Sequence, residues 1–490
     1  MPNVVSSSLR DRLPAVLARP MWALFGLWTL DVWLNQMTTP FLLFGANPGM
    51  QFAIVQMPSV PLLLVAALVF YRRPPAPLGG RLDVPACILM LLGNGAMMGI
   101  DGLPQLVGYV LLGCSGIGFT LLWLRWCALY ASLSSKNVIA CVLVSNALGS
   151  CAKGLLLFVP QEACLWLIAL LPLACLACLR QAGRQVDAEP ALRGTDAASR
   201  EGAVSGAPAS ARIYCRRGSM GPVWHVAACL VVGNALLVMG NMCIVDESDM
   251  VSDLVQYGLS ALVCLGILAL FVHGGVRVDF TTLWTLVLTI AATALVFIAV
   301  QEYFALPGAL SLRLLFSLTH VVVNALGILC FTELARHSDI HAACLFSVAR
   351  LCRLVPLGII SLGGHINFLD DRHFAVPLLL YAVVLAIWLA YWRRTDFQFM
   401  FMDLYTPAPT VGEGPTMASR CARIGGEFGL TDREVEVMTM MAQGRSRAYI
   451  AEALYLSENT VKGHARHVYA KLGIHNRTEL QKMTDEEPRG

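Results

Sequence analysis

The chain of 490 residues is poor in charge. Only 14% of its residues are Asp, Glu, Lys or Arg, whereas charged residues make up about a quarter of an average globular domain. Hydrophobic residues account for 57% of the chain, and the mean hydropathy is +0.65. This balance excludes an ordinary soluble protein and predicts an integral membrane protein. The formal net charge of +3 adds little, because in a membrane protein the positions of the charges matter more than their sum.

Motifs of common enzymes are also missing. The sequence has no phosphate-binding Walker loop, no nucleophile elbow and no cluster of residues at metal-ligand spacing. Its sixteen cysteines are scattered through apolar runs, and Cys175 and Cys178 lie together inside one such run, so we interpret them as small buried side chains. We expect no enzymatic activity, no bound metal and no cofactor.

Long hydrophobic runs dominate the first four fifths of the chain. Twelve of them approach the ~20 residues that a helix needs to cross the hydrocarbon core of a bilayer. Their approximate ranges are 21–44, 51–71, 82–101, 104–124, 138–159, 163–180, 223–245, 253–273, 280–300, 309–332, 341–362 and 373–392. We predict an all-α fold with a polytopic membrane domain, in which residues 1–20 form a tail, residues 21–180 hold the first six spans and residues 223–392 hold the last six.

The distribution of basic residues predicts the orientation of these spans. When residues 1–20 are placed in the cytoplasm, the loops on that side carry most of the Arg and Lys residues, and the opposite loops carry mainly Asp and Glu. This pattern agrees with the positive-inside rule. Since an even number of spans returns the chain to its starting side, we predict a multi-pass protein of the cytoplasmic (inner) membrane with both termini in the cytoplasm.

A short turn recurs six spans apart. The sequence GGRLD at residues 79–83 enters the third span, and GGVRVD at residues 274–279 enters the ninth. Between the two sets of spans, residues 181–222 are polar and rich in Ala, Gly and Ser, so we expect a flexible cytoplasmic linker. Six plus six spans around a long central loop resembles the major facilitator fold, whose halves are parallel repeats. The resemblance implies a 6+6 pseudo-repeat.

The last part of the chain is a soluble segment with clear helix boundaries. Residues 406–426 contain three prolines and four glycines, so we predict that residues 393–426 are a linker. We expect a small four-helix domain over residues 427–483, followed by an acidic tail at residues 484–490.

Polar cap residues divide this domain into its four helices. Thr431 is followed three residues later by Glu434, which is the pattern of a capping box. Apolar residues at helical spacing then predict a first helix over residues 432–443 and a third over residues 458–472. The four cap residues are Thr431, Ser446, Ser457 and Asn476.

The sequence of this domain matches a known DNA-binding pattern. The segments L-T-x-R-E-x-E-V-M, A-x-G-x-S, I-A-x-x-L-x-L-S-x-x-T-V-K-x-H and K-L-G-I-x-N-R-x-E-L follow one another in register over roughly the last 60 residues. This series resembles the LuxR-type helix-turn-helix of the NarL/FixJ class. The resemblance implies that the third helix enters the major groove of double-stranded DNA. It also implies that the fourth helix makes a homodimer, and that RNA polymerase is a further partner.

The resemblance assigns contacts to individual positions of the third helix. Lys462, Gly463 and Arg466 occupy the positions that meet base edges, while Thr460 and His464 lie near phosphate. The implied DNA-binding residues are Ser457, Asn459, Thr460, Lys462, Gly463, His464, Arg466 and Lys471. Acidic residues slightly outnumber basic ones from residue 427 onward, so we expect only modest non-specific affinity for DNA. A helical bundle that binds protein instead of DNA is the alternative interpretation.

Several predicted spans carry polar residues that are costly inside a bilayer, and each such residue marks a candidate site. The set predicted to bind a ligand is Asp31, Asn35, Lys153, His320, Asn324, Arg350 and Arg353. We hypothesise that the three cations line a central cavity and attract an acidic or phenolic small molecule, with His320 and Asn324 as specificity contacts. The alternative is an internal ion pair, for instance between Asp31 and one of these cations.

Together these features predict a one-component transcription regulator held in the membrane, with a small-molecule sensor in its twelve spans and a DNA-binding domain at its C-terminus. The sequence leaves two alternatives open. One is a major-facilitator-like transporter with an appended regulatory helix-turn-helix, and the other is a plain membrane anchor for a constitutive regulator.

Overall fold

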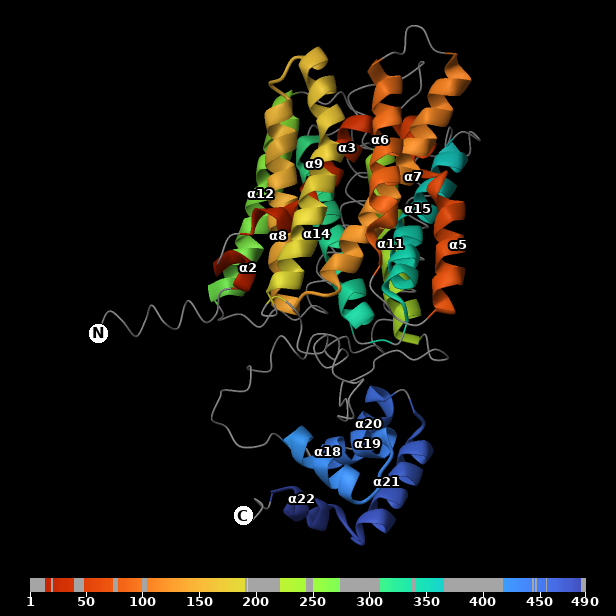
Figure 1. Cartoon of the computed structure of the whole chain (residues 1–490), viewed down its shortest axis with the longest axis vertical. Coiled ribbons are helices and arrows are strands. Elements are labelled where there is room, and N and C mark those ends of the chain that lie inside the picture. The colour runs from red at the N-terminus through yellow and green to blue at the C-terminus, as the bar shows by residue number, and fades with distance from the viewer. Residues whose placement is uncertain are drawn as a thin grey trace, which may run out of the picture. The chain divides into compact units, whose positions relative to one another are not determined.

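A computed structural model provides the three-dimensional structure of the chain (Figure 1). It describes residues 14–18, 21–38, 48–73, 78–98, 104–189, 192, 221–243, 250–273, 309–336, 338, 340–364, 417–442, 445, 447–454 and 456–485. The described residues form α-helices and short 3-10 helices, and they contain no β-strand. The predicted all-α class therefore holds for the described part of the chain.

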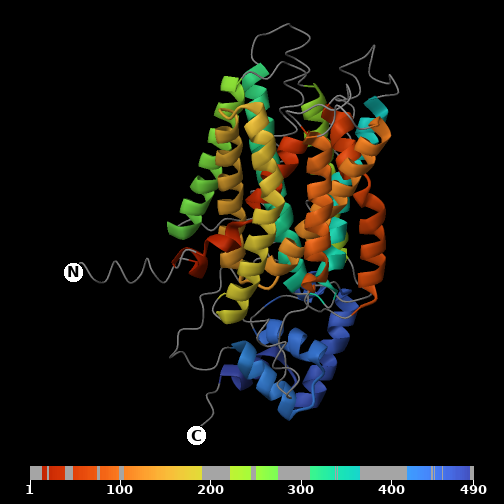
Figure 2. The same cartoon turned by 45° about the horizontal axis from the view of Figure 1, so that its top comes forward.

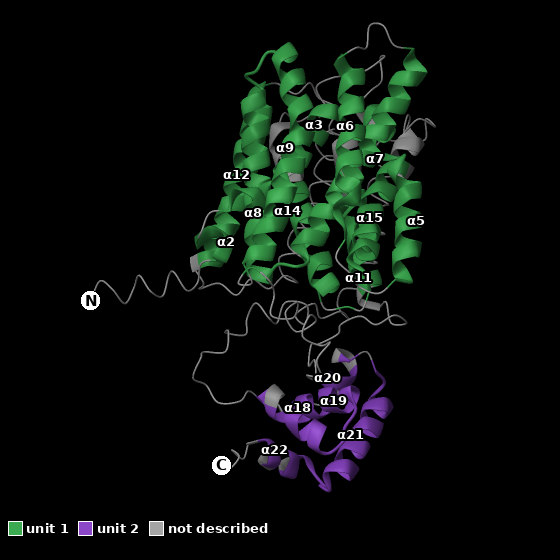
Figure 3. Cartoon of the chain, in the orientation of Figure 1, with its two compact units in different colours: residues 1–197, 213–401 green, residues 198–212, 402–490 purple. Residues whose placement is uncertain are grey.

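The chain divides into two compact units (Figure 3). The first unit comprises residues 1–197 and 213–401, and the C-terminal unit comprises residues 198–212 and 402–490. The helical elements of the first unit are α2 (Ala15–Ala18), η1 (Trp22–Phe25), α3 (Trp28–Thr38), α4 (Pro48–Gln56), α5 (Ser59–Tyr71), η2 (Gly80–Leu82), α6 (Asp83–Met98), α7 (Gln105–Tyr130), α8 (Ser135–Leu156), α9 (Gln161–Ala188), α11 (Gly221–Cys243), α12 (Met250–His273), α14 (Ala309–Arg336) and α15 (Ala342–Gly364).

Within the described residues, six helices are long and apolar enough to cross a membrane. They lie at Gln51–Tyr71, Gly80–Met98, Gln105–Tyr130, Ser135–Leu156, Gln161–Ala188 and Met250–Val272. Large apolar side chains such as Leu68 on α5, Leu106 on α7 and Leu262 on α12 are more than half exposed, as expected for helices that face lipid. These findings are consistent with a membrane protein. They cover half of the twelve predicted spans, and the predicted spans 280–300 and 373–392 lie outside the described residues.

Three boundaries of the predicted membrane domain need correction. The predicted span 21–44 is not one helix, because the chain changes at Gly26 from a 3-10 turn to α3. A Cβ atom at Gly26 would lie 2.5 Å from Cβ of Cys178, so only glycine permits this close approach to α9. The linker predicted to begin at residue 181 is helical through Ala188 at the end of α9. The predicted tail includes the helix α2, whose Val16 is fully buried.

Several pairs of helices in the first unit pack against one another. In three of them α3 packs on α8, α4 on α7, and α5 on α15. In another three α11 packs on α15, α12 on α14, and α12 on α8. Helix α7 also contacts α15, and α8 contacts α14. Helices from residues before 190 and after 220 therefore interleave in space, as the two views of the bundle make visible (Figures 1 and 2).

Two large buried side chains of this bundle hydrogen-bond to neighbouring helical elements. Trp33 is fully buried, and its indole N–H donates to Oδ1 of Asn94 at 2.9 Å. The hydroxyl of Tyr130, also fully buried, donates to the carbonyl of Leu24 at 2.8 Å. Such bonds satisfy donors that would otherwise lose hydration on burial, and they fix the register between helices.

The C-terminal unit contains five described helices: α18 (Met417–Glu427), α19 (Asp432–Ala442), α20 (Arg447–Ala453), α21 (Glu458–Leu472) and α22 (Arg477–Asp485). The predicted third helix, 458–472, is confirmed at both ends, and the predicted first helix, 432–443, is confirmed to within one residue. The shared core is apolar and consists of Cys421, Ile424, Val437, Met438, Met441, Ala442, Ile450, Ala451, Val461, Ala465, Val468, Leu472 and Leu480.

Helix α18 was not predicted, so the four-helix domain and the linker ending at residue 426 are both wrong at this boundary. Cys421 and Ile424 of α18 are buried against α19, which makes α18 part of the domain. Gly425 permits the contact, because a Cβ there would lie 2.4 Å from Cγ2 of Val435. The adjacent Gly426 faces open space.

Candidate nucleic-acid interface and central polar cluster

Helix α21 has well-formed caps at both ends. At its N-terminus, Oγ of Ser457 accepts a hydrogen bond from the backbone N–H of Thr460 at 3.1 Å. At its C-terminus, Gly473 adopts a left-handed conformation with φ of 68°, and its N–H donates to the carbonyl of Tyr469. Glycine takes this conformation without steric cost. The sequence therefore fixes the start and the end of α21, and with them the residues that its outer face presents.

The two faces of α21 differ sharply in burial. Val461, Ala465 and Val468 are buried in the core of the domain. On the opposite face, the side chains of Lys462 and Arg466 are exposed. The other predicted contact residues on or beside this face are the exposed Ser457, Asn459 and Thr460 and the half-buried Gly463 and His464. Asn459, Lys462 and Arg466 thus lie on successive turns along one exposed side of α21. The DNA-binding role of the predicted residues stays a prediction.

Lys471, the eighth predicted residue, is engaged inside the domain. Its Nζ donates to Oε2 of Glu434 at 2.7 Å and to the carbonyl of Gly429 at 3.0 Å. The ammonium group therefore binds α19 and the turn before it. The role of Lys471 as a DNA contact stays a prediction, because two of its three donors are used within the domain and its side chain is 38% exposed.

Glu434 also closes the predicted capping box. Its Oε2 accepts from the backbone N–H of Thr431 at 2.8 Å, and its own N–H donates to Oγ1 of Thr431 at 3.3 Å. The hydrogen bond from Lys471, followed by that from the Thr431 backbone, lowers the pKa of Glu434 from 4.5 to about 2. One carboxylate therefore caps α19 and ties it to α21.

Other arginines of the domain bind backbone carbonyls. Nη2 of Arg433 donates to the carbonyl of Leu454 at 2.5 Å, and Nε of Arg477 donates to that of Met441 at 2.8 Å. These bonds connect α19 with α20 and α22. They also explain why the count of basic residues overstates the charge available to DNA.

One exposed residue that the sequence analysis missed is His467 on α21, whose Nδ1 lies 3.7 Å from Oε1 of Glu434.

Comparison with known proteins agrees with this geometry. Residues 429–484 match the family model described as "Bacterial regulatory proteins, luxR family". The C-terminal domain is a luxR-family DNA-binding domain. The predicted resemblance is thereby confirmed for this part of the chain.

Curated relatives match the same short region. The chain is 46% identical over 50 residues to "Transcriptional regulatory protein DegU" of Brevibacillus brevis, covering 10% of this chain and 21% of the relative. It is 48% identical over 48 residues to "Nitrate/nitrite response regulator protein homolog" of Haemophilus influenzae, covering 10% and 23%. It is 43% identical over 51 residues to "Fimbriae Z protein" of Salmonella typhimurium, covering 10% and 24%. The chain thus spans less than a quarter of the length of these relatives, and the likeness is confined to the luxR-family domain.

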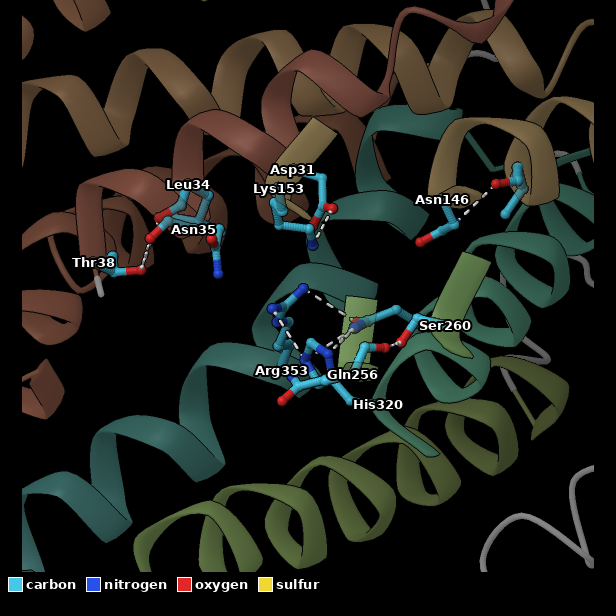
Figure 4. A network of polar contacts seen from close by, with 12 residues as sticks. Asp31, Leu34, Asn35, Thr38, Asn146, Lys153, Gln256, Ser260, His320 and Arg353 are labelled. Carbon is cyan, nitrogen blue, oxygen red and sulfur yellow. Dashed lines mark hydrogen bonds and ion pairs between the residues drawn. The ribbon is translucent and has the colours of Figure 1, made fainter. Parts of the chain in front are cut away.

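The second candidate site lies inside the first unit, where polar side chains from five helices converge (Figure 4). We call it the central polar cluster. Its members are Asp31 and Asn35 of α3, Lys153 of α8, Tyr257 of α12, His320 and Asn324 of α14, and Arg353 of α15. Nζ of Lys153 lies 2.7 Å from Oδ2 of Asp31, so the internal ion pair that the sequence left as an alternative is present.

The remaining predicted residues of the cluster bind one another. Nη1 of Arg353 donates to Oδ1 of Asn324 at 3.1 Å, and its Nη2 lies 3.4 Å from Nε2 of His320. Because a guanidinium can only donate, His320 accepts at Nε2 and is neutral in this arrangement. The side chains of all three residues are half-buried.

Arg350 does not join this group, which corrects the predicted set. It is 2% exposed and lies over the rings of Phe119 and Trp123, with its guanidinium carbon 4.9 and 5.4 Å from their centroids. Its Nη2 donates to Oε1 of Gln56. Although Arg350 and Arg353 are three residues apart, their directions around α15 differ by about 60°, and their long side chains reach different neighbours.

Tyr257 is the member of the cluster that the sequence analysis missed. Nζ of Lys153 lies 5.6 Å from the centre of its ring, and its hydroxyl is hydrogen-bonded with Asn35. Tyr257 lies about two turns into α12. An aromatic residue in an apolar run is not costly to bury, so the sequence does not mark it as a candidate site. Only the packing of α12 against α8 identifies it.

Proposed function

We propose that this protein is a membrane-bound transcription regulator that binds DNA through α21 and responds to a small molecule in the central polar cluster. One observation carries the proposal: a luxR-family domain is joined in the same chain to a unit with six helices able to cross a membrane. The name of the matched relative DegU describes a transcriptional regulatory protein, which supports this role for the shared domain.

In this proposal the exposed face of α21 lies in the major groove. Lys462, Arg466 and Gly463 meet base edges, and Asn459, Thr460 and His464 lie along the sugar-phosphate backbone, with Ser457 holding the start of the helix. The exposure of Asn459, Lys462 and Arg466 along one side of α21 supports the assignment. We further propose that α22 pairs two domains, so that the operator has two-fold symmetry and RNA polymerase is recruited beside it.

We also propose that the first unit is a twelve-span, 6+6 bundle of the cytoplasmic membrane, with both termini in the cytoplasm. The helix pairs support the repeat. If α3, α4 with α5, α7 and α8 are spans 1, 2, 4 and 5, then α11, α12, α14 and α15 are spans 7, 8, 10 and 11. A shift of six spans maps the pair α3/α8 onto α11/α15, α4/α7 onto α12/α14, and α5/α15 onto α12/α8, and all six pairs are in contact.

A transporter with a regulatory domain is the second candidate function. The same interleaved pairs favour it, because parallel repeats around a polar midplane site are the arrangement that supports alternating access. Uptake of radiolabelled compounds into proteoliposomes separates the two candidates, since a sensor binds its ligand without accumulating it inside.

Selection of DNA tests the proposed function. Full-length protein in detergent is incubated with random double-stranded DNA, and bound sequences are enriched over several rounds. We expect a two-fold motif. The variant with both Lys462→Ala and Arg466→Ala should lose at least about 30-fold in affinity, since each base contact contributes about 1–3 kcal/mol.

Arg423→Ala provides the matched control, because Arg423 is an exposed cation on α18 that pairs with Glu427. It should bind the motif as the wild type does. Recovery of no motif by the wild type, or equal binding by the double variant, would overturn the assignment of α21 as the DNA-reading helix.

A further inference from the structure

The central polar cluster has an unequal charge balance. The charged residues that the hydrogen bonds and the ion pair of the cluster involve are two cations, Lys153 and Arg353, and one acid, Asp31. A further acid, Asp253 of α12, acts electrostatically on Tyr257. Asp31 binds Lys153 directly, at 2.7 Å. Both described hydrogen bonds of Arg353 go to neutral side chains, those of Asn324 and His320. With His320 neutral, the cluster carries one excess positive charge.

The cluster is also divided between the two halves of the bundle. Asp31 and Lys153 belong to α3 and α8, which precede the central segment of the chain. Arg353, Asn324 and His320 belong to α14 and α15, which follow it. The ion pair of Asp31 with Lys153 lies within the first group, and the hydrogen bonds of Arg353, Asn324 and His320 lie within the second. Tyr257 of α12 contacts Lys153 and Asn35 across the two groups, but no charged pair does so among the described contacts. A bound group that contacts both cations would therefore bridge the halves.

An uncompensated cation at this depth is costly. Lys153 has 12% of its side chain exposed, and Arg353 is half-buried, so neither has the hydration of a surface residue. A buried charge is tolerated when an opposite charge and hydrogen bonds compensate it. Asp31 compensates one cation of the two. Among the described residues of the cluster one positive charge is left uncompensated, and a single negative charge with at least two acceptor atoms would neutralise it.

Building on the proposed function, we infer that the ligand is an organic monocarboxylate whose two oxygens bridge Arg353 and Lys153. One carboxylate brings the cluster to neutrality and gives Arg353 the planar, two-oxygen acceptor that a guanidinium binds best. A phenol does not, because it is uncharged near pH 7 and leaves the excess charge in place. The aromatic face of half-buried Tyr257, beside Lys153, provides a surface for the apolar body of such a ligand.

Binding would couple to conformation through this bridge. The carboxylate contacts both cations only in a conformation in which α8 and α15 place Lys153 and Arg353 close enough to bind the same group. The affinity of the protein for the ligand therefore differs between conformations of the bundle. A ligand shifts an equilibrium only by such a difference. The bridged conformation is thus the one that the ligand stabilises.

Thermal unfolding of the full-length protein in lipid nanodiscs tests this inference, with benzoate as the probe and benzamide as its uncharged match. Saturating benzoate should raise the melting temperature by about 3 °C, and benzamide should not. Arg353→Gln should abolish the shift. Lys136→Met, at the exposed start of α8, should retain it.

Removal of Lys153 alone would leave the Asp31 carboxylate without its cation. The second variant therefore combines Lys153→Met with Asp31→Asn and removes the whole ion pair. It should fold and should require at least 10-fold more benzoate for the same shift. Three results would overturn the inference: equal shifts with benzoate and benzamide, a benzoate shift that survives in both variants, or no wild-type shift with benzoate, phenylacetate or cyclohexanecarboxylate.

The DNA selection described above distinguishes this inference from the proposed function. If the protein selects a DNA motif but none of the three carboxylates raises its melting temperature, the regulator proposal stands and the carboxylate inference is wrong. If a carboxylate raises the melting temperature but no DNA motif is selected, the ligand site stands and the transporter is favoured.

Discussion

Glu434 joins three parts of the luxR-family domain through a single carboxylate, which accepts from Lys471 of α21 and caps α19 at Thr431. Its pKa is lowered from 4.5 to about 2 by these bonds. A carboxyl group whose pKa is lower in the folded state stabilises the fold when ionised. Its contribution is complete above about pH 4.5 and is lost as the pH falls through 2.

We predict that Glu434→Gln lowers the free energy of opening of this domain by about 1–2 kcal/mol at pH 7, less than the full pKa shift implies because Lys471 is partly exposed. Hydrogen exchange of residues 429–484, measured by mass spectrometry on the full-length protein, checks this. Wild type and variant should converge near pH 2. Glu427→Gln, which removes an exposed pair with Arg423, should change the free energy by less than about 0.5 kcal/mol.

At the scale of elements, α18 owes its place to one of two adjacent glycines. We predict that Gly425→Ala destabilises the domain by about 1–3 kcal/mol, because its Cβ would lie 2.4 Å from Cγ2 of Val435. Gly426→Ala should be neutral or stabilising by up to about 1 kcal/mol, since nothing lies within 4 Å and alanine favours a helix. Hydrogen exchange of α18 and α19 distinguishes the two variants. Equal effects would show that α18 does not pack on α19 as described.

A second pair of glycines tests the packing of α4 against α7. A Cβ at Gly116 would lie 1.5 Å from the carbonyl oxygen of Val55, whereas a Cβ at Gly95 on α6 meets nothing within 4 Å. We therefore expect Gly116→Ala to lower the melting temperature of the detergent-solubilised protein by several degrees, and Gly95→Ala to leave it unchanged. A tolerated Gly116→Ala would contradict the close approach of these helices.

The sequence predicted elements well where caps specify them. Ser457 and Gly473 determine α21 locally, so its bounds could be predicted from the chain alone. Helix α18 could not be predicted, because its two glycines and the preceding prolines are typical of a linker. Its apolar face is recognised only when its packing against α19 is known. The same limit applies to Arg350 and Arg353, since their separation depends on which helices surround α15.

At the scale of the whole molecule, one chain contains a luxR-family domain and a unit with six described helices that are long and apolar enough to cross a membrane. The family model matches residues 429–484 of the C-terminal unit, and the first unit lies outside that match. Its interleaved helices and its central polar cluster are therefore the basis on which sensing is proposed. A plain anchor would need neither the cluster nor its charge imbalance.

We predict that Arg353→Gln changes expression of target genes while leaving the amount of protein in the membrane unaltered, as measured by transcript counts and quantitative immunoblotting. Unchanged transcripts would favour the anchor.

The most direct test of the central claim is to isolate membranes from cells that express the full-length protein, after crosslinking, and to sequence the DNA that remains bound to it. The account predicts discrete peaks in the membrane fraction that disappear when Lys462 and Arg466 are both replaced by alanine. Absence of peaks from the membrane fraction, or peaks that persist in the double variant, would contradict a membrane-bound regulator that reads DNA through α21.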